Sequence, residues 1–230
     1  MAAMFGRIAG RYDLLNTVMS GGRHYAWRRK AVDLVMPSTP YKNGRALDIA
    51  SGTGDFALDL ALRQEVAGVI GLDFALRMLP IARKKAQKRK QGATASFLAG
   101  DAHNLPFADN TFVCATVGFG VRNFIDVPSA LREIERVLKP GGKVAILEIV
   151  RQDGRNPVAR LFPIYFRYVT PWLGSLIAGD REAYTYLPES VQEFMSASEL
   201  KELMHAAGLK KVTVSSVAFG TTVILVGEAS

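Results

Sequence analysis

The sequence predicts an α/β fold, with a mostly parallel sheet, helices on both of its faces and an antiparallel hairpin at its C-terminal end. Three observations support this prediction. Apolar runs alternate with amphipathic helical segments between residues 45 and 150, the order typical of parallel strands joined by crossover helices. A glycine-rich turn follows the first run, at the place where open parallel sheets bind ligands. Two closing apolar runs, at 210–216 and 221–226, predict the hairpin.

Residues 4–36 are expected to form two helices that precede the sheet. Apolar side chains recur at helical spacing on both sides of the pair Gly21-Gly22, which separates the two segments. Because both helices come before the first strand, we expect residues 1–36 to form a helical cap that lies across one end of the sheet.

The central region contains five expected strands and three expected helices. The strands are expected at 45–50, 68–73, 94–98, 112–117 and 143–150. The helices are expected at 55–65, 75–91 and 126–138. The last of these stops at the proline and two glycines of 140–142. A further helix begins at the capping box formed by Ser196 and Glu199 and ends at Gly208.

Residues 155–190 break the alternation of strands and helices. The stretch 161–174 is apolar and aromatic, but two prolines and Arg167 interrupt it, whereas a membrane-spanning helix needs about 20 largely apolar residues. We therefore expect 155–190 to be an apolar insertion that caps the substrate side of the sheet. Because no linker or repeat is evident, the 230 residues predict a single domain over 1–230.

The composition predicts a globular cytoplasmic protein. The apolar fraction is 49%, the single Cys114 excludes a disulfide framework, and the N-terminal residues lack the pattern of a secretory signal. The net charge of +8 has a local source in the basic side chains between residues 83 and 90. We expect a solvated helix face there, or attraction to an anionic membrane surface. No zinc-ligand spacing or RNA-binding signature supports nucleic acid as a partner.

The turn after the first strand is the first candidate ligand site. Gly52-Thr53-Gly54 with Ala57 matches the pattern G-x-G-x-x-A, in which glycines allow a sharp turn and a close approach of the ligand. Asp73 ends the next strand about 20 residues later, where a carboxylate can accept hydrogen bonds from ribose hydroxyls. Together they predict an adenosine-containing ligand, and they fit NAD and S-adenosylmethionine alike.

Two further carboxylates favour the methyl donor over the dinucleotide. Asp48 lies inside the first strand, where it can hold the turn or face an ammonium group. The pair Asp101-Ala102 follows the third strand, within reach of an adenine edge. Each acid alone is equally compatible with a cap or a turn. Together with Asp73, the two acids suit a ligand with ammonium and sulfonium charges and would repel a pyrophosphate.

Several motifs together resemble those of a known enzyme family. Motifs that resemble those of class I S-adenosylmethionine-dependent methyltransferases stand at residues 47–55, 71–74, 105–107 and 136–142. More specific signatures resemble the UbiE/COQ5/MenG family of quinone-biosynthesis C-methyltransferases, at 4–16, 119–123 and 184–190. The chain departs from the family pattern at 219–224, where members tend to carry a histidine, and at Gly118, where many carry serine.

The resemblance implies a Rossmann-like class I methyltransferase fold and S-adenosylmethionine as the cofactor. It also implies methylation of a ring carbon in a prenylated quinol, for example demethylmenaquinol, after a neighbouring hydroxyl has lost its proton. This chemistry requires no metal, and the sequence contains no evident cluster of metal ligands. The expected cofactor-binding residues are Asp48, Gly52, Thr53, Gly54, Asp73, Phe74, Asp101, Ala102 and Gly118.

The residues that act on the acceptor are expected after the fourth strand and on the flanking segments. Arg122 and Asn123 are the candidate catalytic residues, since a guanidinium can stabilise a developing phenolate or orient a water that accepts its proton. Arg122 could instead form a structural pair with a carboxylate such as Asp126. His103 is expected to be a solvent-exposed neighbour of Asp101. The candidate substrate-binding residues are Tyr12, His24, Tyr184 and Tyr186.

A prenylated acceptor implies peripheral contact with the inner face of the membrane, through segment 161–179, the N-terminal helices and the basic run. Ordinary core packing of the same aromatic side chains is the alternative. Other functions remain open: methylation of another lipophilic or small acceptor, an NAD(P)-dependent oxidoreductase, and a non-catalytic protein that binds the donor or associates with nucleic acid. The sequence does not decide between a benzoquinol and a naphthoquinol ring, and it indicates neither tail length nor oligomeric state.

Overall fold

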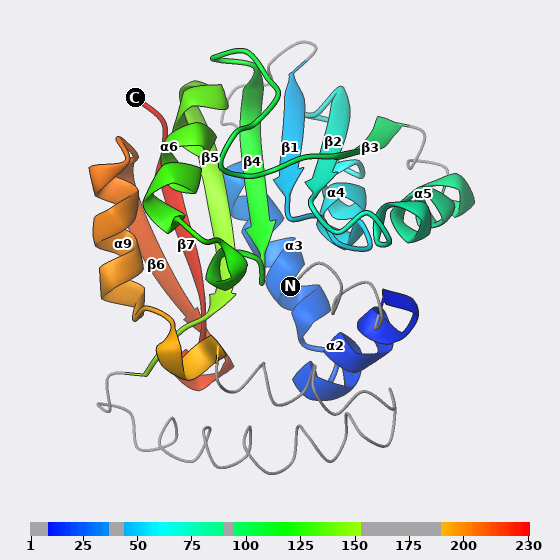
Figure 1. Ribbon diagram of the computed structural model, residues 1–230, viewed down its shortest axis with the longest axis horizontal. Helices are drawn as coiled ribbons and strands as arrows, with labels where there is room; N and C mark the ends of the chain where they lie inside the picture. The colour runs from blue at the N-terminus through cyan, green and yellow to red at the C-terminus, as the bar shows by residue number, and fades with distance from the viewer. Residues whose placement is uncertain (1–8, 37–43, 90–93, 153–189) are drawn as a thin grey trace.

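A seven-stranded sheet forms the centre of the molecule. The computed structural model describes residues 9–36, 44–89, 94–152 and 190–230. The strands lie in the order β3-β2-β1-β4-β5-β7-β6 (Figure 1). The first five strands along the chain pair in parallel, and β7 runs antiparallel to both of its neighbours, β5 and β6. This confirms the predicted mostly parallel sheet with a closing antiparallel hairpin.

The strand bounds agree with the expected ones to within two residues, except at the start of the fifth strand. The strands are β1 (Arg45–Ile49), β2 (Gly68–Asp73), β3 (Ala95–Ala99), β4 (Phe112–Gly118), β5 (Leu138–Ile149), β6 (Lys210–Val217) and β7 (Thr222–Glu228). β5 begins before the expected residue 143 because its first residue already pairs with β4. Leu138 pairs with Phe112 and Lys143 with Cys114, so the residues between them form an irregular bulge. Gly141 permits this bulge with a φ of +77°.

Two of the helices are shorter than predicted. The helices are α2 (Tyr12–Ser20), α3 (His24–Val35), α4 (Asp55–Leu60), α5 (Leu79–Lys88), α6 (Val127–Val137) and α9 (Ala197–Ala206), with 3-10 turns η1 (Ala9–Arg11), η3 (Val121–Asn123) and η4 (Ala218–Gly220). α4 and α5 cover only part of the expected 55–65 and 75–91. The predicted capping box at Ser196 and Glu199 is confirmed at the start of α9. No helix in these described ranges is long and apolar enough to cross a bilayer.

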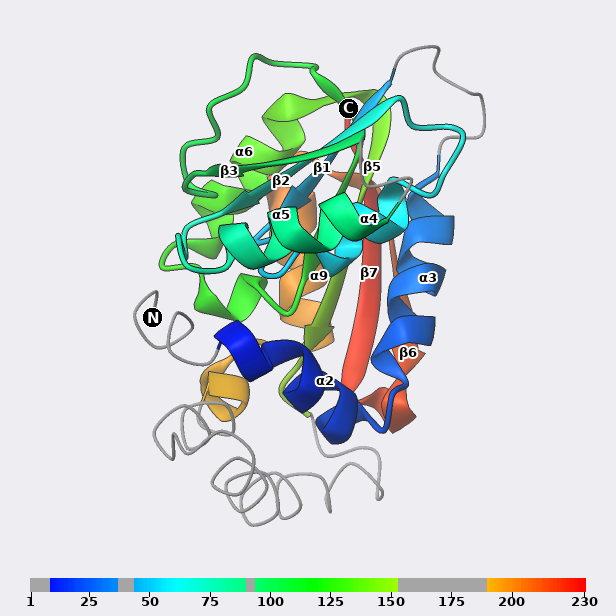
Figure 2. The same cartoon turned by 90° about the vertical axis from the view of Figure 1, so that its right-hand side faces the viewer.

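Helices cover both faces of the sheet, as predicted. α3, α4 and α5 lie on one face, and α6 and α9 lie on the other (Figures 1 and 2). β1 shows how the sequence supplies both apolar layers, because successive side chains of a strand point to opposite faces. Leu47 and Ile49 join the core with α6 and α9, whereas Ala46 joins the core with α3, α4 and α5.

The two N-terminal helices take different positions, and only one of them fits the predicted cap. α2 lies beyond the carboxyl ends of the strands (Figure 1). α3 instead packs along a face of the sheet, because its apolar stripe of Ala31, Val32 and Val35 is buried there with β-strand side chains. Gly21 and Gly22 make the turn between the helices with φ values of +56° and +75°.

Candidate functional site

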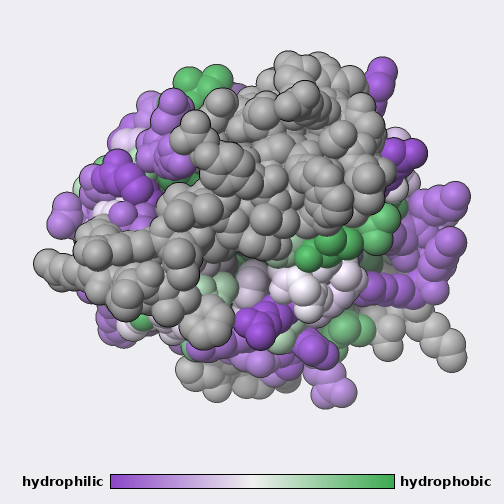
Figure 3. Space-filling model, turned by 90° about the horizontal axis from the view of Figure 1, so that it is seen from below, coloured by the Kyte–Doolittle hydropathy of each residue, from purple (hydrophilic) through white to green (hydrophobic). Residues whose placement is uncertain are grey.

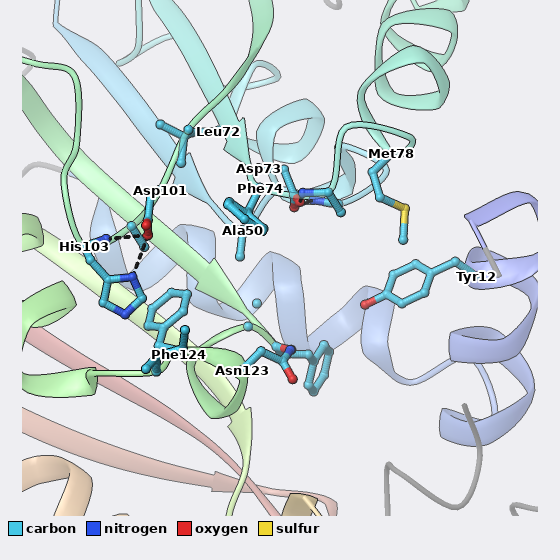
Figure 4. Close-up of a pocket in the computed structure, with 18 residues that line it drawn as sticks. Tyr12, Ala50, Leu72, Asp73, Phe74, Met78, Asp101, His103, Asn123 and Phe124 are labelled. Carbon is cyan, nitrogen blue, oxygen red and sulfur yellow. Dashed lines mark hydrogen bonds and ion pairs between the residues drawn. The ribbon is translucent and has the colours of Figure 1, made fainter. Parts of the chain in front are cut away.

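A cleft opens at the carboxyl ends of the strands, between the sheet and α2 (Figure 4). Tyr12 lies at one end and His103 at the other, with Asp73 and Phe74 between them. The predicted site residues that line the cleft are Tyr12, Gly52, Asp73, Phe74, Asp101, Ala102, Gly118 and Asn123. The two tyrosines of the later segment, Tyr184 and Tyr186, lie outside the described residues, as does the insertion 155–190.

A smaller hollow lies behind the glycine turn and contains other predicted residues. His24, Asp48 and Thr53 line it, together with Tyr12, Gly52 and Gly118, which also line the cleft. In the described part of the chain, Gly54 and Arg122 belong to neither lining. The structure thus brings most of the predicted site residues to one edge of the sheet, in two adjoining cavities.

Asp73 connects the glycine turn with the loop after β2. One carboxylate oxygen accepts a hydrogen bond from the backbone N–H of Gly52 at 2.6 Å, and the other accepts one from Ala75 at 2.7 Å. Burial raises the pKa of this carboxyl, although both hydrogen bonds act in the opposite direction. Each carboxylate oxygen can accept a further hydrogen bond. Asp73 can therefore support the turn and bind a hydroxyl pair at once.

The two glycines of the turn have different surroundings. Gly52 has a φ of +54°, and a Cβ at this position would lie 3.9 Å from a ring carbon of Tyr12. A side chain there would project into the space between the turn and Tyr12. Gly54 is closed on the other side, because its Cβ would lie 2.8 Å from the ring of Phe97. The two glycines therefore have different roles: Gly52 keeps space for a ligand, and Gly54 permits close packing.

Gly118 packs closely against Phe56, so this position has no room for a side chain. A Cβ at Gly118 would lie 2.6 Å from two ring carbons of Phe56. We expect Gly118→Ser to lower the free energy of unfolding by about 1–3 kcal/mol, through overpacking. Adding Phe56→Leu should recover much of this loss, and urea unfolding measures both effects. Gly10→Ser is the control, since no atom lies within 4 Å of its Cβ position. Equal losses in the single and double variants would refute the explanation.

Asp48 on β1 supports the glycine turn that follows this strand. Its carboxylate is 1% exposed and accepts hydrogen bonds from the Ala57 backbone N–H and the Thr116 hydroxyl, both at 2.9 Å. The bond to Ala57 satisfies a backbone donor in the first turn of α4, as a capping residue does. The sequence left two roles open for Asp48, to hold the turn or to face an ammonium group. Its hydrogen bonds correspond to the first role, because they hold the turn.

Asp48→Asn is expected to remove a pH dependence of stability. Burial raises the pKa of the Asp48 carboxyl to about 8. Since the unfolded-state value is about 3.9, the folded state binds more protons between these two values, and stability falls as pH rises through this window. The free energy of unfolding of the parent should therefore fall by about 2 kcal/mol more than that of the variant from pH 6 to pH 8. Urea unfolding at each pH measures the difference; parallel curves would contradict the assignment.

An ionic network fastens α2 to the outside of the turn. The Thr53 hydroxyl donates to Asp13 Oδ1 at 2.6 Å, and Lys85 Nζ lies 2.6 Å from Asp13 Oδ2 and 2.7 Å from Asp55 Oδ1. Arg28 extends the network, with Nη1 3.3 Å from Asp55 Oδ2. The charge of Lys85 is thus paired with two carboxylates of the protein itself. This is a structural role for one member of the basic run, for which the sequence predicted a solvated or membrane-facing surface.

Arg122 is paired with a carboxylate that the sequence analysis missed. Its Nη1 lies 2.5 Å from Glu148 Oε1, and its backbone N–H donates to Glu148 Oε2 at 3.3 Å. Glu148 on β5 is fully buried. Asp126, the partner considered from the sequence, instead caps α6 by accepting from the Ser129 N–H at 3.0 Å. The missed signal was an acidic residue inside the apolar run of β5, where a buried charge needs a partner.

Two predicted acceptor-side residues have perturbed pKa values. Burial raises the pKa of the Tyr12 phenol, and the positive charge of Arg122 partly offsets this shift, so the two groups act on each other electrostatically. Burial lowers the pKa of His24, which is 3% exposed and has Nδ1 2.8 Å from the Ser20 hydroxyl. Tyr12 extends into the cleft, whereas His24 lies in the hollow behind the turn.

His103 does not occupy the exposed position that the sequence predicted. Its side chain is 22% exposed and lines the cleft. The ring lies between the loop after β3 and the loop before α6, with Nδ1 2.5 Å from Asp101 Oδ1 and Nε2 3.1 Å from the backbone N of Asp126. The prediction failed because the partner segment lies 23 residues away in the sequence.

Comparison with known proteins decides the family. A family model described as the ubiE/COQ5 methyltransferase family matches residues 1–228. The chain belongs to this family. A demethylmenaquinone methyltransferase from Thermus thermophilus is 46% identical over 225 residues, covering 98% of this chain and 99% of the relative. One from Thermotoga maritima is 38% identical, covering 98% of this chain and 94% of the relative.

Solved structures confirm the Rossmann-like methyltransferase fold. A SAM-dependent methyltransferase from Thermotoga maritima superposes with a TM-score of 0.68 at 22% identity, covering all of both chains. The carbon methyltransferase CurJ superposes with a TM-score of 0.62 at 15% identity, covering 87% of this chain and 54% of that chain. At these identities the likeness concerns the fold alone.

Proposed function

We propose that the chain transfers a methyl group from S-adenosylmethionine to a ring carbon of a prenylated quinol, with demethylmenaquinol as the acceptor. One observation carries the choice of acceptor. Relatives named demethylmenaquinone methyltransferase match 98% of this chain at 46% and 40% identity. A relative named for both ubiquinone and menaquinone biosynthesis is 35% identical, and this lower identity favours the naphthoquinol over the benzoquinol ring.

The residues around the cleft fit the methyl donor. The Asp73 carboxylate, which retains capacity for further hydrogen bonds, suits the two ribose hydroxyls, and the space left by Gly52 suits the chain that leads to sulfur. Phe74 and Ala102 offer apolar contact to adenine, and Asp101 offers an acceptor at its edge. The bound donor would supply an electrophilic methyl group. Thr53 and Asp48 would act through the turn that they support.

The acceptor is proposed to lie between Tyr12 and Asn123, which line the cleft. Arg122 lines neither cavity, so its guanidinium would stabilise the phenolate of a deprotonated quinol through its charge, as it lowers the pKa of the Tyr12 phenol. Its Nε–H is buried and donates to no partner in the described part of the chain. The role of the protein is then to align the ring carbon with the methyl group, to exclude water and to stabilise this charge.

Contact with the membrane is proposed because the acceptor tail resides in the bilayer. Large apolar side chains beside the cleft support it: Phe74 is 67% exposed, Leu76 66% and Ile125 98%. Apolar side chains are also visible on the face of the molecule seen from below (Figure 3). Flotation with anionic liposomes at low and high salt tests the contact. A Phe74→Ser/Ile125→Ser variant should float less, and no association of the parent at either salt concentration would exclude the contact.

Methylation itself is tested with a donor that carries a labelled methyl group and a panel of demethylated naphthoquinols and benzoquinols, kept reduced. We expect the label on a ring carbon of the naphthoquinol, located by NMR of the product. The dinucleotide alternative is tested by calorimetry with S-adenosylhomocysteine and NADH. Binding of NADH without S-adenosylhomocysteine would overturn the proposal, and label on oxygen would overturn its C-methylation part.

A further inference from the structure

His103 joins the two walls of the cleft at the end opposite Tyr12 (Figure 4). Its backbone N–H donates to Asp101 Oδ1 at 2.9 Å, and its ring Nδ1 lies 2.5 Å from the same oxygen. On the other side of the ring, Nε2 accepts a hydrogen bond from the Asp126 backbone N–H at 3.1 Å. One side chain therefore connects the loop after β3 with the loop before α6.

These partners define the tautomer and the orientation of the ring. A backbone N–H can only donate, so Nε2 is the acceptor and Nδ1 carries the proton that is donated to Asp101. The ring also meets Phe124 edge-on, with centroids 5.8 Å apart and planes at 70°. Three contacts in different directions leave the imidazole of His103 with a single position.

The hydrogen bonds of His103 fix the orientation of the Asp101 carboxylate. Its Oδ1 accepts both hydrogen bonds from His103, while Oδ2 accepts none from the described residues. The hydrogen bonds from the backbone and from the ring of His103 lower the pKa of the Asp101 carboxyl, so it is anionic at neutral pH. The Asp101 side chain is 52% exposed and lines the cleft. It thus presents one fixed, anionic oxygen that lacks a donor.

We propose that His103 is a positioning residue that makes the nucleoside end of the cleft selective for adenine. This inference rests on the proposed binding of S-adenosylmethionine in the same cleft. A fixed carboxylate oxygen accepts a hydrogen bond from the 6-amino group of adenine and repels the 6-keto oxygen of hypoxanthine. A carboxylate free to rotate would adapt to either base, so the selectivity depends on the ring that holds it.

The test compares S-adenosylhomocysteine with S-inosylhomocysteine by calorimetry. The measured quantity is the ratio of their dissociation constants, which a general loss of stability does not change. We expect the parent to prefer the adenosyl compound by about tenfold to a hundredfold, the range for one hydrogen bond to a charged group. His103→Ala removes the bond from the ring and keeps the one from the backbone N–H, so this ratio should fall at least about threefold.

Two near-isosteric variants separate the contacts of the ring. Asn places its amide N–H near the position of Nδ1. His103→Asn should therefore keep the bond to Asp101 and most of the preference for the adenosyl compound. Gln reaches the position of Nε2 instead, so His103→Gln should keep the contact with Asp126 but lower the ratio of dissociation constants as much as His103→Ala does. His205→Asn on α9, outside the cleft lining, is the matched control. Equal ratios in the Asn and Gln variants, or an unchanged ratio in the Ala variant, would overturn the inference while leaving donor binding intact. If the parent binds neither compound, the proposed function itself fails.

Discussion

Asp73→Ala is expected to weaken the binding of S-adenosylhomocysteine by at least about a hundredfold. Two hydrogen bonds from ribose hydroxyls to a carboxylate contribute about 1.5–3 kcal/mol each, so losing both gives at least this factor. The substitution also removes the acceptor that holds Gly52 and Ala75, at 2.6 and 2.7 Å, and the turn then loses its preorganised shape. Both effects act on the donor, so isothermal calorimetry is the direct measurement.

Two variants make this result interpretable. Asp73→Asn keeps one acceptor oxygen and should give an intermediate loss, because it cannot support two hydroxyls and two backbone donors together. Asp109→Ala is the matched control: its carboxylate is 68% exposed, pairs with Arg136 and lies outside the cleft lining. We expect no change in affinity for this control. An Asp73→Ala protein that is folded and binds the donor product as tightly as the parent would contradict the placement of the ribose.

The sequence was sufficient for the fold and for the edge of the sheet where the site lies. Alternating apolar runs specify parallel strands, and the carboxyl ends of parallel strands meet at one edge, so Gly52, Asp73 and Asp101 had to lie close together. The structure confirms this expectation. Their spacing in the sequence therefore predicted that they lie together in the folded protein, because the connections between parallel strands are regular.

The partners of buried charges could not be predicted in this way. Glu148 on β5 meets Arg122 in η3, the turn that follows β4, whereas the sequence offered Asp126 as a nearer carboxylate for Arg122. The Asp126 side chain instead caps α6, where it accepts a hydrogen bond from the Ser129 backbone N–H, and Arg122 pairs with Glu148. His103 escaped prediction for the same reason, because its second contact depends on how two distant loops approach each other. Side-chain pairing follows from tertiary packing, which periodicity does not encode.

Glu148→Ala should lower the free energy of unfolding by about 3–5 kcal/mol, the cost of leaving one member of a buried ion pair without its partner. The pair is well shielded, with 6% exposure of the Arg122 side chain and none of Glu148. Glu148 also accepts a hydrogen bond from its neighbour, the Ile149 backbone N–H, at 2.9 Å, so alanine strands a second donor. Urea unfolding measures the loss. Asp109→Ala is the matched control, because its carboxylate is 68% exposed and its ion pair with Arg136 should contribute less than about 1 kcal/mol.

A double-mutant cycle then separates the pair from its surroundings. If the two charges stabilise each other, Arg122→Met with Glu148→Leu should be less unstable than the sum of the single variants, with a coupling energy of roughly 1–3 kcal/mol. Glu148→Gln provides the functional test, since it keeps an acceptor for the guanidinium but removes the charge. If Glu148 orients Arg122 towards a phenolate, this variant should bind S-adenosylhomocysteine normally and turn over about 10–100-fold more slowly. Normal turnover in Glu148→Gln, or a coupling energy near zero, would mean that the pair does not hold Arg122 for catalysis.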